Sequence, residues 1–168
     1  MTATVETLTR RLQRLEAIEA IRTLKARYLS ACDAKQVDSI RDCFVDGEVI
    51  IDYGAVGRFT HREQLLDVFT QFACNDYVHD LHLGGNPQID IIDDTNARGT
   101  WTLLFFQVNT AAQTVMQMGC TYDDTYRCVD GEWKILTTRS RPHVTEMMKL
   151  EDGLHRIQFA GNAMKTFG

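Results

Sequence analysis

The sequence lacks the features that mark several broad classes of protein. It has only 2 prolines and 11 glycines in 168 residues, and 44% of its residues are hydrophobic, which excludes collagen-like repeats and disorder. It contains no run of about 18 apolar residues, the length that a membrane-spanning helix needs. Residues 1–14 alternate charged and apolar side chains, unlike a secretory signal. We therefore expect one globular domain over residues 1–168, located in the cytoplasm.

Positive charge is also scarce, since 18 Lys and Arg face 23 Asp and Glu and the net charge is −5. Binding to nucleic acid requires clustered Lys and Arg, so we expect no nucleic-acid partner. The sequence has no GxGxxG, P-loop or GxSxG motif. A nucleotide-dependent enzyme therefore has no support, and neither does a thiol hydrolase, because the cysteines lack a nearby pattern of His and acid residues.

The cysteines do not form a pattern either. They are Cys32, Cys43, Cys74, Cys120 and Cys128. Their odd number, wide spacing and lack of a CxxC pair argue against disulfides and against a zinc site, and buried free thiols in a reducing compartment are expected. His79 and His82 would point to opposite faces of a strand, so we expect no metal, and nothing in the sequence calls for an organic cofactor.

What the sequence does contain is helices first and strands afterwards. Helices are expected over residues 5–34 and 36–44, and a third runs from a capping-box pattern at residues 60–63 to about Phe72. Strands are expected at 48–53, 79–83, 87–92, 97–108, 113–128 and 132–141, with a hairpin turn at Asp130-Gly131. A weaker helix is expected over 145–165.

This order predicts an α+β fold in which the helices pack against one face of an antiparallel sheet. A strongly curved sheet around a long helix would form a cone with an open, apolar mouth. Residues 12–141 would form the core of the domain and residues 142–168 a C-terminal tail, which could fold over that mouth.

Several polar residues stand where apolar ones are expected. Asp33 lies on the apolar arc of the first helix, as does Tyr28. His82 shares a strand face with Asp80 and Gly84. A carboxylate beside His82 would hold its imidazole in one tautomer and make it more basic. The ordinary alternatives are a turn-capping Asp33, a core histidine and amphipathic packing of Tyr28.

The later strands add further candidates. Asp124 is the one charge in an apolar column of strand 113–128, and Phe105 and Gln107 share a face of strand 97–108. Arg141 or Arg139 would reach the pocket from the last strand. Solvent-exposed strand ends are the alternative for Asp124 and for the arginines. The second apolar face of strand 97–108 predicts a contact between subunits.

Three segments carry a resemblance to a known family. They are LEAIEAIRTLKARYLSACDAKQVDSIRDCFVDGEVIIDY, HLGGNPQIDIIDDTNARGTW and GCTYDDTYRCVDGEWKI. Together they resemble the SnoaL-like family of the nuclear-transport-factor-2-like superfamily, from about Leu12 to Arg141. Within it, the sequence is most similar to the bile acid 7α-dehydratase type, and more distantly to scytalone dehydratase and hexachlorocyclohexane dehydrochlorinase.

The resemblance implies a cone-shaped α+β barrel and roles for particular residues. Asp33 and His82 match the Asp–His dyad of these elimination enzymes, and Tyr28 matches a pocket tyrosine of the bile acid type. Tyr53 matches a pocket tyrosine of scytalone dehydratase, and Arg141 falls near a pocket arginine of the bile acid type. Phe105 departs from the pattern, because the bile acid type has an acid at that position.

The resulting hypothesis is a cofactor-independent dehydratase that acts on a hydrophobic cyclic substrate such as a steroid or polyketide. His82 would take a proton beside a carbonyl, Asp33 would orient it, and Tyr28 or Tyr53 would bind the carbonyl oxygen. Two alternatives remain open, a ketosteroid-type isomerase and a noncatalytic small-molecule-binding protein. The resemblance also suggests a homotrimer, with a dimer as the alternative.

Overall fold

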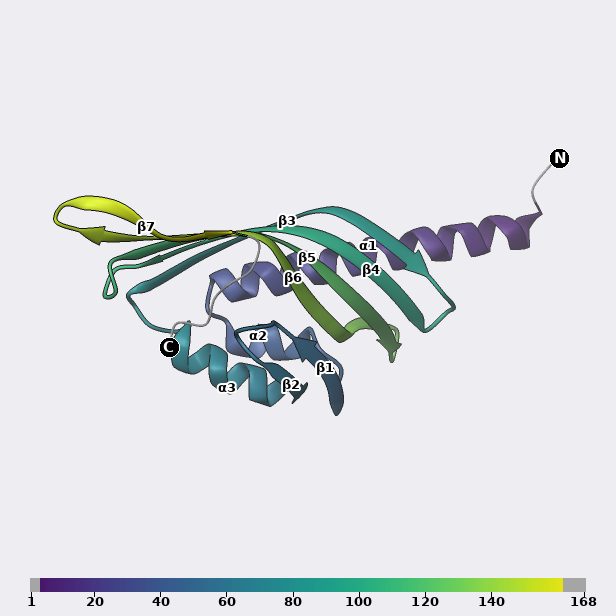
Figure 1. Ribbon diagram of the computed structural model, residues 1–168. Helices are drawn as coiled ribbons and strands as arrows, with labels where there is room; N and C mark the ends of the chain where they lie inside the picture. The colour runs from purple at the N-terminus through teal and green to yellow at the C-terminus, as the bar shows by residue number, and fades with distance from the viewer. Residues whose placement is uncertain (1–3, 162–168) are drawn as a thin grey trace.

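The structure is a computed structural model that describes the backbone of residues 4–161 and the side chains of residues 4–156. Three helices and seven strands follow one another along the chain (Figure 1). They are α1 (Val5–Asp33), α2 (Val37–Asp42), β1 (Glu48–Asp52), β2 (Arg58–His61), α3 (Arg62–Phe72), β3 (Val78–Ile91), β4 (Asn96–Asn109), β5 (Thr114–Val129), β6 (Glu132–Glu151) and β7 (Leu154–Gly161). This is the predicted α+β order, with β2 as an addition and β7 in place of the expected C-terminal helix.

All seven strands belong to one curved, open sheet in the order β2-β1-β6-β5-β4-β3, and β7 pairs with β6. The sheet is mixed rather than antiparallel, because β1 runs parallel to β6. Figure 1 shows α1 lying along the concave side of the sheet, with α2 and α3 beside the short strands β1 and β2. The fold is thus the expected cone.

The long helix α1 is buried only in its second half. Thr4 caps its first turn by accepting a hydrogen bond from the Thr7 N–H at 3.3 Å. Leu8 and Leu15 belong to the apolar arc of the sequence, yet both are more than half exposed, because this end of the helix projects past the sheet (Figure 1). The buried residues are Ile21, Leu24, Lys25, Tyr28, Leu29, Ala31 and Cys32.

The helix α3 begins one residue later than the capping pattern predicted. His61 is its N-cap, and the partner residue is Gln64 rather than Glu63. The Gln64 side-chain oxygen accepts from the backbone N–H groups of His61 and Thr60, at 3.2 and 2.9 Å. This capping box stabilises the start of α3 because it provides an acceptor for N–H groups that have no partner inside the helix.

The two short strands expected at 79–83 and 87–92 are one continuous strand, β3, interrupted by a bulge. Gly85 pairs with Thr102, whereas Gln88 pairs with Thr100, so β3 has one extra residue opposite β4. Asn86 at the bulge has φ = 49°, a left-handed conformation that Asn tolerates better than most residues. The bulge is a local irregularity and not the end of the strand.

The expected C-terminal helix over 145–165 is wrong. β6 continues across the expected core boundary at residue 141 to Glu151, and β7 returns alongside it. Asp152 and Gly153, both with positive φ, form the two-residue turn that joins antiparallel strands. No side chain of residues 145–156 lines the cavity described below, and residues 162–168 of the expected tail lie outside the described range.

The core fills the space between the concave face of the sheet and the helices. It contains one buried ion pair, between Lys25 of α1 and Asp124 of β5. None of the helices in the described part of the chain has both the length and the apolar character that crossing a membrane would require.

Candidate active site

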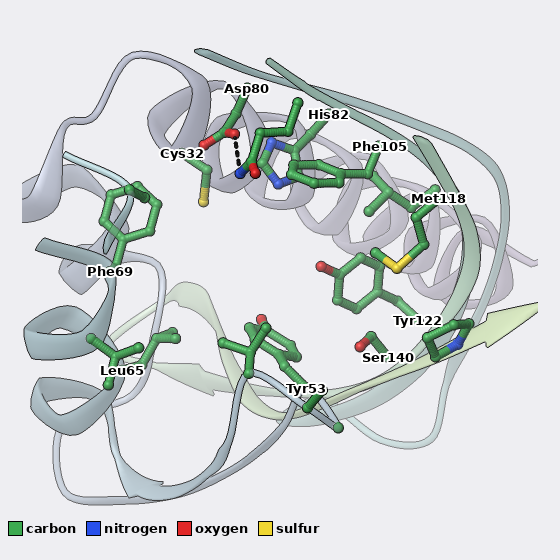
Figure 2. A pocket seen from close by; sticks show the side chains of 18 of the residues that line it. Cys32, Tyr53, Leu65, Phe69, Asp80, His82, Phe105, Met118, Tyr122 and Ser140 are labelled. Atoms are coloured by element: carbon green, nitrogen blue, oxygen red, sulfur yellow. Dashed lines mark hydrogen bonds between the residues drawn. The ribbon is translucent and has the colours of Figure 1, made fainter. Parts of the chain in front are cut away.

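The mouth of the cone is a cavity of about 650 Å³, within the range typical of small-molecule sites. Its wall is mainly apolar and comes from the three helices, from strands β1 to β6 and from the loop between β1 and β2 (Figure 2). Leu65 and Phe69 of α3 face Phe105 and Met118 of the sheet across the opening. Polar groups enter this cavity at a few points only.

The first polar point joins α1 to β3. His82 Nδ1 lies 2.6 Å from Asp33 Oδ1, and the His82 backbone N–H donates to both carboxylate oxygens at 3.1 and 3.2 Å. An ionised carboxylate can only accept, so Nδ1 is the donor in this pair, and in the neutral imidazole Nε2 then has a free lone pair. Within residues 4–156 no hydrogen-bond partner of Nε2 is found. The sequence predicted this pair, and the fold brings it together.

Close packing keeps the His82 ring in place. The ring packs against Phe105 with centroids 4.7 Å apart. Two residues along β3, a Cβ on Gly84 would lie 2.6 Å from Cδ1 of the Leu29 side chain of α1, so any larger residue here would require that side chain to move. This close approach of strand and helix brings Asp33 within reach of His82.

A second polar group is a tyrosine cluster formed by Tyr28, Tyr53 and Tyr122, all of which line the cavity. The hydroxyls of Tyr28 and Tyr53 lie 2.7 Å apart, and the Tyr53 and Tyr122 rings pack edge to face at 5.8 Å. Burial raises the pKa of all three phenols, so they remain protonated hydrogen-bond donors at neutral pH. Tyr28 and Tyr53 were expected here, whereas Tyr122 was not among the expected site residues.

A third polar group, centred on Asp80, was not predicted from the sequence. Asp80 lies in the cavity wall with its side chain only 4% exposed. Its Oδ1 accepts from Gln107 Nε2 at 2.9 Å, the hydrogen bond drawn in Figure 2, and its Oδ2 pairs with the Lys35 ammonium. Gln107 was expected in the pocket. The signal for Asp80 was its place on the same strand face as His82.

Two further candidates occupy other positions. Arg141 lies at the rim, where its side chain is 63% exposed and pairs with Asp123 at 2.5 Å. Asp124 is buried but does not line the cavity. It lies behind the wall and pairs with Lys25 at 2.8 Å, so the expectation that it contacts a substrate does not fit its position. Asp124 is in an apolar column because its partner is a buried cation.

The arrangement of potential metal ligands does not indicate a metal site. In residues 4–156 no group of three or more His, Cys, Asp or Glu side chains converges as metal ligands would. Cys32 does line the cavity, but burial raises the pKa of its thiol to about 12, which keeps it protonated and unreactive at neutral pH.

Comparison with solved structures places this architecture among known folds. The chain is similar to a putative scytalone dehydratase from Novosphingobium aromaticivorans, with 22% identity, a TM-score of 0.70, and coverage of 79% of this chain and 88% of that one. It is also similar to a hexachlorocyclohexane dehydrochlorinase, LinA-type3, from Novosphingobium barchaimii LL02, with 19% identity, a TM-score of 0.74, and coverage of 87% and 97%.

The sequence itself provides the family assignment. The family model described as a SnoaL-like domain matches residues 13–139, a range that contains Asp33, His82 and the tyrosine cluster. The cone-shaped α+β fold and this match agree, and the chain belongs to the SnoaL-like domain family.

Proposed function

We propose that the protein is a cofactor-independent lyase that removes water from a hydrophobic cyclic β-hydroxy ketone by β-elimination. The observation that carries the proposal is the His82–Asp33 pair at the cavity wall, with Nδ1 held at 2.6 Å and Nε2 without a partner among the described side chains. This arrangement makes His82 a suitable general base. The names of the similar proteins, a dehydratase and a dehydrochlorinase, both denote eliminations.

In the proposed reaction, His82 Nε2 takes a proton from the carbon next to the carbonyl group. The electron pair of the broken C–H bond forms an enolate, which then expels the β-hydroxyl group and becomes a conjugated C=C bond. The imidazolium of His82 returns the proton to the departing oxygen, so the products are an unsaturated ketone and water. Asp33 stabilises the imidazolium and fixes its orientation.

The tyrosine cluster would receive the carbonyl oxygen. In the Tyr28–Tyr53 pair one hydroxyl donates to the other, which leaves the second hydroxyl hydrogen free for a ligand. A donor that already points to this position would strengthen its hydrogen bond as negative charge develops on the oxygen. Phe105 and the apolar wall would hold the ring system, and Gln107 and Arg141 would add polar contacts at the far end and at the rim.

The test compares two histidines of β3. His82→Ala should lower turnover by about 10²–10⁴-fold, the usual contribution of a general base. His79→Ala is the matched control, because His79 is exposed and three residues away on the opposite face. Turnover would be followed on a panel of steroid-like and polyketide-like β-hydroxy ketones. Equal activity of His82→Ala and wild type on a turned-over substrate would refute the role of His82.

An isomerase is the second candidate, and the same geometry favours it. A histidine base and phenol donors also suffice to move a proton between two carbons of an enone. The residue that packs against the His82 ring is Phe105, where the bile acid type has an acid. The product mass separates the two reactions, because dehydration lowers it by one water and isomerisation leaves it unchanged. A noncatalytic binding protein would show saturable binding with neither product.

We also propose a homotrimer formed through the outer face of the sheet, with a dimer as the alternative. Leu81, Leu83, Leu104 and Val144 project from this face and are 45–56% exposed in the single chain, a grouping that soluble monomers usually avoid. Leu104→Glu should yield monomers in multi-angle light scattering. A monomeric wild type at micromolar concentration would contradict the assembly.

A further inference from the structure

A buried cation lies directly behind the cavity wall. The Lys25 side chain is 1% exposed, and its ammonium donates to Asp124 Oδ2 at 2.8 Å. The same oxygen accepts from the Tyr126 hydroxyl at 2.8 Å, which in turn accepts from Trp101 Nε1 at 2.8 Å. The other oxygen of Asp124 has no partner within the described residues. The carboxylate is therefore only partly satisfied, which argues against a pair selected for stability alone.

The ammonium also touches the tyrosine cluster. Lys25 Nζ lies 3.8 Å from the centroid of the Tyr122 ring and 5.4 Å from that of Tyr28. Figure 2 shows the Tyr122 hydroxyl pointing into the cavity, towards the space below His82. The two rings line the cavity, whereas Lys25 and Asp124 do not. The cation is thus separated from a bound ligand by the thickness of an aromatic ring.

This placement has an electrostatic consequence. Coulomb interactions are strong where water is excluded and decrease with distance, so the ammonium, 3.8 Å from the centroid of the Tyr122 ring, acts strongly on that ring. The Asp124 carboxylate acts in the opposite direction and raises the pKa of Tyr53 and Tyr122. Its Oδ2, however, is already bound by the ammonium and by the Tyr126 hydroxyl. A cation against the face of a phenol ring favours negative charge on that ring and on a group bound to its hydroxyl. Neither effect requires the ammonium to touch the ligand.

We propose that Lys25 is a positioning residue which gives the tyrosine cluster a positive potential and makes this end of the cavity a binding site for the oxygen anion of a phenolate or a ring enolate. The role in turnover rests on the proposed function, because the anion would be the enolate oxygen of that reaction. The ligand class follows from the same observations: an aromatic or cyclic body for the apolar wall and one anionic oxygen for the tyrosines.

The experiment measures the pKa of bound 2-naphthol by its absorbance, in wild type and in K25Q/D124N. The double substitution removes both charges and keeps an amide donor facing an amide oxygen, so the fold has a replacement hydrogen bond. We expect the pKa of bound 2-naphthol to be about one unit higher in the variant, a tenfold change in its ionisation constant. An unchanged or lower value would overturn the proposal, as would a wild type that does not bind 2-naphthol.

Two further variants keep the result interpretable. Y126F breaks the same hydrogen-bonded chain and leaves the ammonium, so the pKa of bound 2-naphthol should stay at the wild-type value. K25M/D124L replaces the pair with apolar groups and takes over the test if K25Q/D124N does not fold. No turnover is involved, so a failure of this inference is distinct from a failure of the His82 mechanism, which His82→Ala tests separately.

Discussion

Two pairs of charged or titratable side chains join α1 to the sheet, about two helical turns apart, and they differ in access to the cavity. In the Asp33–His82 pair the side chains are 25% and 14% exposed, and His82 Nε2 has no partner in the part of the chain that the structure describes. In the Lys25–Asp124 pair they are 1% and 0% exposed and lie behind the wall. The first pair can therefore exchange a proton with a ligand, whereas the second can act on it only through its field.

Because of this difference, the two pairs should differ in the folding free energy that is lost when each is broken. A partly exposed pair loses little folding free energy, because water replaces the missing partner. A fully buried pair leaves an uncompensated charge in the core. Breaking the Asp33–His82 pair should therefore lower activity more than stability, whereas breaking the Lys25–Asp124 pair should mainly lower stability.

The largest expected effect is on turnover at the cavity pair. Asp33→Asn keeps the shape of the side chain but removes the charge that holds the His82 tautomer and stabilises its protonated form. We expect turnover to fall by about 10²–10⁴-fold, while the free energy of unfolding changes by no more than about 1 kcal/mol. Steady-state kinetics and urea denaturation measure the two quantities. A large loss of stability would mean that the pair is mainly structural.

The next effect is on stability at the buried pair. Lys25→Met leaves the Asp124 carboxylate without its cation, and we expect a loss of about 3–5 kcal/mol in the free energy of unfolding. K25M/D124L removes both charges and should recover most of that loss. Urea denaturation of the two variants checks this, and equal destabilisation by both would show that the charge of Asp124 is not the cause.

Breaking the pair between Lys35 and Asp80 should reduce the free energy of unfolding by an amount between those expected at the other two pairs. Its side chains are 22% and 4% exposed, so Lys35→Met strands a carboxylate that still has Gln107 as a partner. We expect a loss of about 1–2 kcal/mol. Lys149→Met is the control, since Lys149 and Glu151 form an exposed pair at 3.7 Å. A larger effect at Lys149 than at Lys35 would contradict the link between burial and cost.

The smallest effect concerns the thiol of Cys32. Because burial raises its pKa to about 12, the reactive thiolate is a minor species, at about 10⁻⁴ of the total at pH 8. Alkylation by iodoacetamide should be slow at pH 7 and rise about tenfold per pH unit up to pH 10, with no plateau. Mass spectrometry of the Cys32 peptide would follow it, and a plateau near pH 8.5 would indicate an ordinary, accessible thiol.

The same comparison shows how far the sequence could be interpreted. Asp33 was predicted because it stands out as polar on the apolar arc of its helix, and His82 because a carboxylate beside it would orient its imidazole. A family resemblance linked the two. Lys25 lies on the same apolar arc but was not noticed, because a long side chain there is usually taken as reaching solvent. Its partner is distant in sequence, and only the curvature of the sheet brings Asp124 to it. Whether the two residues of such a pair lie close together depends on tertiary packing, which no local sequence pattern encodes.

The error in the C-terminal segment has a different cause. Asp152-Gly153 is the same kind of turn signal as Asp130-Gly131, and it was available in the sequence. A helix was expected over 145–165, although apolar residues over a short stretch do not separate helix from strand. The turn chemistry was the better guide.

The bulge at Asn86 shifts the alternation of β3 by half a period. Before it, even-numbered residues such as Asp80 and His82 face the cavity, and after it odd-numbered ones such as Ile89 and Ile91 pack against the core. The two halves of β3 can therefore alternate independently, so that the first places side chains in the cavity wall and the second places them against the apolar core. Removal of one residue at this point would turn either the histidine or the isoleucines outward, so the extra residue is what allows both regions to share a single strand.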